Sequence, residues 1–230
     1  WSAAAMSMPY YVSPEQMMKD RADFARKGIA RGRSLVAMQY QEGIAVIAEN
    51  PSNTLRKISE IYDRIAFAGV GKYNEFDQLR VLGVRAADLK GYQFSREDVD
   101  ARSLANQYAQ MIGQVFTHEV KPLEVEILIA ELGKSAETDQ LFHVMFDGTV
   151  LDERNFIVIG GDPESIAHKI AQSFVASQSL QACISLARAA LSPAEMPLAA
   201  SDLEVAVLQR NGNRRCFKRI TEAQLTNLLD

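Results

Sequence analysis

The order of strand-like and helix-like segments is the feature that most restricts the fold of this chain. A helix comes first, followed by four strands, two helices, three or four strands, two helices, two strands and a last helix. Residues 34–40 and 44–49, joined by Gln41, Glu42 and Gly43, predict an antiparallel hairpin. Such runs of strands exclude a doubly wound parallel sheet. We predict an α+β fold of four layers, α-β-β-α, in which two stacked sheets carry helix pairs outside.

Hydrophobic spacing and turn residues place the individual elements. Further strands are expected at residues 58–64, 65–71, 123–132, 140–146, 156–159, 203–208 and 214–220. Helices are expected at residues 15–27, 73–89 and 99–117, and after Asp162, Ser179 and Thr221.

The N-terminal helix has a well-marked start. Ser13 is the predicted N-cap, Pro14 occupies the first helical position, and Gln16 would complete a capping box. Gly28 is predicted to end the helix. Few of its residues are apolar, so we expect it to pack against something outside its own domain.

Composition limits the classes of partner. The chain has 230 residues, 47% hydrophobic and 23% charged, with a formal net charge of −4. Mild acidity gives no reason to expect nucleic acid, and the longest apolar stretch, residues 65–71, is too short to span a membrane. Cys183 and Cys216 are isolated, which suits a reducing compartment, so we expect a cytoplasmic protein. Residues 1–5 are interpreted as a cloning remnant or a misplaced start ahead of Met6.

A search for catalytic or metal-binding motifs returns none. The histidines, His118, His143 and His168, share no metal-ligand spacing. The Gly69-Val-Gly71-Lys72 stretch lacks the further residues of a phosphate loop, so we expect close packing of a strand on a helix. Glu124 and Glu126 are predicted on the solvent side of an edge strand or interface. Six basic residues between positions 19 and 33 suit a solvated or subunit-facing helix.

The chain closely resembles the α subunits of bacterial (actinobacterial-type) 20S proteasomes. The resemblance is carried by residues 6–32, by SLVAMQYQEGIAVIAENPSNTLRKISEIYDRIAFAGVGKYNEFDQLR, and by KGYQFSREDV, SLANQYAQMIGQVFT, KPLEVEILIAE, LEVAVL and FKRI. It covers nearly the whole chain from Met6 onward. It implies a sandwich of the N-terminal-nucleophile-hydrolase type, with the same four layers.

The resemblance also implies a subunit without catalytic activity. In catalytic relatives a threonine becomes the first residue after processing, because its hydroxyl is the nucleophile and its free amine the base. Here Arg33 occupies the place of that threonine, and Glu49 falls where the enzymes carry an acidic residue. The alternative is a catalytic β-type subunit, with Ser34 as the nucleophile after cleavage. A free-standing adaptor, which would be a monomer, is a third possibility.

By the same resemblance, residues 14–230 form one domain of a homoheptameric α ring on each end of a barrel of proteolytic β subunits. The helix at residues 14–28 would lie along a neighbouring subunit. The N-terminal tail would close the axial pore to unfolded protein substrates; it comprises Met6, Ser7, Met8, Pro9, Tyr10, Tyr11, Val12 and Ser13.

Lys57, in NTLRKISE, would line a pocket between adjacent α subunits that receives the C-terminus of an activator. The activator would be a ring ATPase acting on substrates with the ubiquitin-like tag Pup, or an ATP-independent cap. No cofactor or metal is expected in this chain.

Overall fold

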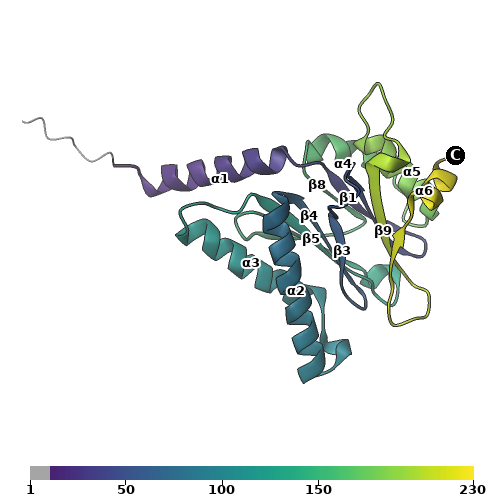
Figure 1. Cartoon of the computed structure of the whole chain (residues 1–230), viewed down its shortest axis with the longest axis horizontal. Coiled ribbons are helices and arrows are strands. Elements are labelled where there is room, and N and C mark those ends of the chain that lie inside the picture. Colours follow the sequence, from purple (N-terminus) through teal and green to yellow (C-terminus); the bar gives the residue numbers. More distant parts are fainter. Residues whose placement is uncertain (1–10) are drawn as a thin grey trace, which may run out of the picture.

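A computed structural model describes residues 11–230, which form two five-stranded antiparallel sheets (Figure 1). The first sheet has the order β10-β9-β2-β1-β8. Its strands are β1 (Leu35–Tyr40), β2 (Gly43–Glu49), β8 (Phe156–Ile159), β9 (Leu203–Gln209) and β10 (Phe217–Ile220). The second sheet has the order β3-β4-β5-β6-β7. Its strands are β3 (Ile58–Tyr62), β4 (Ile65–Gly71), β5 (Val125–Glu131), β6 (Gln140–Val144) and β7 (Val150–Glu153).

Helices cover the outer face of each sheet, and a third apolar core lies between the sheets. The α-helices are α1 (Pro14–Ala30), α2 (Tyr73–Gln93), α3 (Ala101–His118), α4 (Pro163–Ala171), α5 (Leu180–Leu191) and α6 (Glu222–Leu229). Three short 3₁₀ helices are η1 (Arg96–Asp98), η2 (Ala136–Thr138) and η3 (Ala200–Asp202). Helices α2 and α3 pack on the second sheet, and α4 to α6 on the first. The predicted four-layer α-β-β-α sandwich is confirmed.

Helix α1 lies across one end of the sandwich, with its N-terminal part projecting beyond the sheets (Figure 1). Ser13 caps it as predicted, accepting a hydrogen bond from the backbone N–H of Gln16 at 3.2 Å. The predicted capping box is wrong in its second half, because the Gln16 side chain instead donates to Asp20 at 2.7 Å. Gly28 does not end the helix, which continues to Ala30.

Close packing explains why Gly28 lies inside the helix. A Cβ at this position would lie 2.3 Å from Oε1 of Glu124, so only glycine lets α1 approach the start of β5. Gly91 has the same role in α2, where a Cβ would lie 2.0 Å from the hydroxyl of Tyr62. Helix α2 therefore runs past its predicted end at residue 89, to Gln93.

The prediction of a solvent-exposed edge strand for Glu124 and Glu126 is wrong. Strand β5 is the central strand of its sheet, and both side chains are about 13% exposed. Glu124 pairs with Lys121 at 2.9 Å, and Glu126 Oε2 lies 2.6 Å from Nε2 of His143 on β6. Glu124 is covered where α1 crosses this end of the sheet at Gly28, and Glu126 is paired with His143; local spacing in the sequence reveals neither contact.

Three other predictions have clear outcomes. The glycines before α2 allow close packing as predicted, since a Cβ on Gly69 would lie 2.5 Å from the ring of Phe76. The fourth strand of the second run, left open by the sequence, exists as β7, an exposed edge strand. Strand β10 starts later than predicted, because the N–H of Cys216 bonds to the carbonyl of Asp63 outside the ladder.

Candidate functional site

Lys57 lies directly before β3, at the end of a loop that spans residues 50–57. Its side chain lines a pocket of about 280 Å³. The apolar part of the wall comes from Leu55 of the loop and from Tyr73 and Phe76 at the start of α2. The polar part comes from the chain between α1 and β1 and from the end of β2.

One hydrogen bond holds the Lys57 amine in this pocket. The amine donates this bond to the carbonyl oxygen of Arg33, and Nη1 of Arg33 lies 2.5 Å from Oε1 of Glu49. Burial lowers the pKa of Lys57 to about 8, although the carboxylates of Glu204 and Glu49 act in the opposite direction. Arg33 lowers the pKa further by charge repulsion.

The residues of this pocket suit a ligand that carries an anionic group beside an apolar group. Arg31, Arg33 and Lys57 contribute three positive charges, against the single carboxylate of Glu49. Ammonium and guanidinium groups form strong charge-assisted hydrogen bonds with carboxylates. The apolar wall beside them would accommodate a hydrocarbon or aromatic side chain of the same ligand.

The structure brings together three residues that the sequence singled out separately. Arg33 precedes β1 and Glu49 ends β2, and these strands pair so that the N–H of Glu49 bonds to the carbonyl of Ser34 at 3.0 Å. Lys57, which directly precedes β3 of the other sheet, contacts the carbonyl of Arg33 with its amine. Ser34, the alternative nucleophile, is buried with 7% of its surface exposed.

The predicted gate lies partly outside the described residues. This applies to Met6, Ser7, Met8, Pro9 and Tyr10. Of the remaining three, Tyr11 and Val12 are 86% and 42% exposed, and Ser13 caps α1.

The described part of the chain also bears on the metal and membrane predictions. Among residues 11–230, no group of three or more metal-ligating side chains converges. Over the same residues, no helix is long and apolar enough to cross a membrane.

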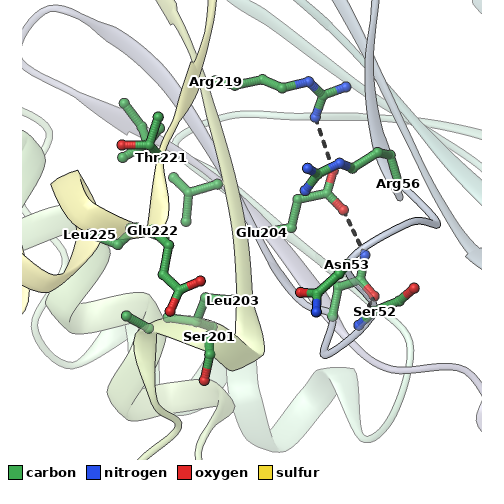
Figure 2. Close-up of a pocket in the computed structure, with 14 residues that line it drawn as sticks. Ser52, Asn53, Arg56, Ser201, Leu203, Glu204, Arg219, Thr221, Glu222 and Leu225 are labelled. Carbon is green, nitrogen blue, oxygen red and sulfur yellow. Dashed lines mark hydrogen bonds and ion pairs between the residues drawn. The ribbon is translucent and has the colours of Figure 1, made fainter.

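Sequence reasoning missed Glu204, a buried carboxylate on β9 beside the Lys57 loop. Its Oε1 accepts hydrogen bonds from the backbone N–H of Lys57 and the side-chain amide of Asn50, both at 2.8 Å. Its Oε2 accepts from the N–H of Ile58 at 3.0 Å and from Arg219 at 3.2 Å. Figure 2 shows Glu204 between Arg219 and the loop. The signal available in the sequence was a single charged residue inside the apolar strand LEVAVL.

Comparison with known proteins places this chain in a family. A family model described as "Proteasome subunit" matches residues 29–208, from the end of α1 to β9. The chain belongs to the proteasome subunit family. Within the family it is 62% identical over 215 residues to the proteasome subunit alpha of Acidimicrobium ferrooxidans, covering 94% of this chain and 93% of the relative.

Two further proteasome α subunits are nearly as similar. The relative from Sanguibacter keddieii is 55% identical over 231 residues, covering 97% of this chain and 90% of its own length. The relative from Geodermatophilus obscurus is 49% identical over 235 residues, covering 98% and 82%. The predicted resemblance to bacterial proteasome α subunits is confirmed, and the Arg33, Glu49 and Lys57 positions all lie within the matched proteasome region.

Proposed function

We propose that this chain is a non-catalytic α subunit of a 20S proteasome, forming homoheptameric outer rings that control substrate entry to the β subunits and dock activators. The observation that carries the docking part is the pocket around Lys57, where a half-buried ammonium lies beside an apolar wall. Such a pocket suits the C-terminus of another protein, which offers a carboxylate and an apolar side chain together.

The absence of peptidase activity follows from the start of β1. Arg33 has no hydroxyl, and its guanidinium is bound to Glu49. A nucleophilic Ser34 would need cleavage of the bond before it to free its amine. That cleavage would detach α1, whose Ala25 and Ile29 are buried in the core between the sheets. The cost of exposing this core argues for an intact chain.

Ring formation is supported by the outward face of α1. One face contacts β4 and β5, and Arg21 bonds to the carbonyl oxygens of Phe116 and Glu119 near the end of α3. Three apolar side chains of α1 nevertheless remain partly exposed, at 37% to 45%; they are Met17, Met18 and Phe24. We infer that a neighbouring copy covers them, since exposed apolar clusters mark interaction surfaces.

Co-expression with a β partner tests the proposed function. We expect barrels in which this chain forms the outer rings by electron microscopy, with peptidase activity present only when the β subunit is included. A covalent inhibitor directed at N-terminal threonine should label the β partner alone, because Arg33 stands where the nucleophile is required. Labelling of this chain by the inhibitor, or peptidase activity of this chain alone, would contradict the proposal.

Docking at Lys57 should depend on pH. The pKa of the free amine is lowered to about 8, and a bound carboxylate favours the ammonium form, so docking above pH 8 requires proton uptake. We therefore expect the affinity for a peptide with a free C-terminal carboxylate to fall by up to about tenfold per pH unit above 8. Below this pH it should be nearly constant, until the peptide carboxylate protonates near pH 3.5.

Calorimetry on assembled barrels from pH 6.5 to 9.5 measures this dependence. Arg33, Glu49 and Glu204 are the charged groups that act on the pKa of the amine. The same peptide with an amidated C-terminus is the control, and its weaker binding should not respond to pH. An affinity of the carboxylate peptide that is the same at pH 7 and pH 9.5 would exclude Lys57 as its partner.

A further inference from the structure

We infer that Glu204 is a positioning residue of the docking pocket, holding the loop of residues 50–57 so that Lys57 faces an incoming carboxylate. The inference rests on the proposed docking function of Lys57. Glu204 itself lies behind the loop, on β9 of the other sheet, and is not among the residues that line the Lys57 pocket.

The loop needs an anchor because it has little packing of its own. Most of its residues are exposed, and Asn50 and Ser52 line both the Lys57 pocket and the cavity in Figure 2. That second cavity has a volume of about 300 Å³ and lies on the β9 side of the loop. The loop therefore forms a thin wall between two cavities. Polar contacts, more than burial, must fix its position.

Glu204 supplies those contacts at both ends of the loop. At the C-terminal end it accepts from the backbone N–H groups of Lys57 and Ile58, at 2.8 and 3.0 Å. At the N-terminal end it accepts from the amide of Asn50 at 2.8 Å. The same Asn50 amide nitrogen donates to the carbonyl of Leu55 at 2.7 Å, which connects the carboxylate to the apolar wall of the pocket.

A carboxylate is the side chain that this arrangement requires. Both oxygens of Glu204 receive donors only, and the side chain is 4% exposed, so water cannot replace a lost partner. Arg219 provides the opposite charge. In glutamine, one oxygen becomes an NH₂ group that faces donors, and at least one backbone N–H beside Lys57 loses its acceptor.

The test compares Glu204→Gln with the parent chain in assembled barrels. The probes are a short synthetic peptide that ends in leucine with a free carboxylate, and the same peptide amidated. We expect the Glu204→Gln change to weaken binding of the carboxylate peptide by about tenfold, the loss typical of a hydrogen bond to a charged group. Binding of the amidated peptide should be weakened less, because this peptide has no carboxylate to pair with the Lys57 ammonium.

The matched control is Glu222→Gln, which removes another carboxylate from the Figure 2 cavity without touching the loop. It should leave both affinities unchanged. If Glu204→Gln barrels do not assemble, Asn50→Ala removes one of the same anchors while leaving Glu204 paired with Arg219. We expect Asn50→Ala to have the same selective effect on the carboxylate peptide.

Two results would overturn the inference: parental affinity for the carboxylate peptide, or an equal loss for both peptides, which indicates general disruption of the pocket. The Lys57→Ala variant, measured in parallel, separates this inference from the proposed function. If Lys57→Ala binds the carboxylate peptide like the parent, the docking function itself fails. If Lys57→Ala loses binding and Glu204→Gln does not, only the role of Glu204 is wrong.

Discussion

Replacing Lys57 with alanine is expected to remove activator-stimulated degradation while the rings still assemble. The Lys57 amine contacts only the carbonyl of Arg33 among the hydrogen bonds of the described chain, so its loss leaves the sheets and their cores intact. The backbone bonds that hold its loop to Glu204 also remain, because they involve the N–H of residue 57 and not its side chain.

The size of the effect follows from the contact that is lost. A hydrogen bond between charged groups is worth about 1.5–3 kcal/mol, or about 10- to 150-fold in affinity at each pocket. An activator that engages several pockets of a ring multiplies these losses through avidity. Stimulation should therefore fall below detection at activator concentrations that saturate the parent barrels.

The measurement is stimulated hydrolysis of an unfolded protein by barrels confirmed intact by electron microscopy. Lys134→Ala is the matched control, because it removes an exposed lysine that lies outside the Lys57 pocket. It should leave stimulation unchanged. Full stimulation of the Lys57→Ala barrels would show that the activator docks elsewhere.

Deleting residues 6–13 is expected to raise the basal hydrolysis of peptides and unfolded proteins without any activator. The N-terminal tail ends at Ser13, which caps α1, and α1 is attached to the body through buried Ala25 and Ile29. In the single chain Tyr11 is 86% exposed and Val12 42% exposed. Seven such tails brought to one axis would bury apolar side chains against each other and exclude water.

The expected increase depends on how rarely the parent gate opens. A minor conformation in a two-state equilibrium has a population of about 0.1–10%, so permanent opening should raise basal hydrolysis by about tenfold or more. Deleting residues 1–5 alone is the control and should leave the basal rate unchanged, since residues 6–13 remain in place. An unchanged basal rate after removal of residues 6–13, on intact barrels, would show that the tail is not the gate.

The N-terminal helix shows which features local sequence patterns predict and which they do not. Its capped start at Ser13 and its thin apolar stripe were predictable, because both depend on residues within one or two turns. The end of the helix was not predictable. Gly28 lies inside the helix because its lack of a side chain leaves room for Glu124, which is almost a hundred residues away in the chain. The same crossing of α1 covers Glu124, which the local pattern had assigned to solvent.

The sequence by itself determined the fold class. The alternation of apolar residues in strands and their spacing in helices indicate which face of each element is buried. Two stacked sheets with helices on their outer faces bury all of these apolar faces. It also determined the family, through motifs spread over the chain. Only the tertiary structure decided the pocket. Arg33, Glu49, Lys57 and Glu204 come from four strands or strand ends in two sheets, and register and sheet stacking bring them together. The carboxylate of Glu204 can be buried because four hydrogen-bond donors surround it. These donors come from distant segments of the chain, so local sequence spacing does not predict them.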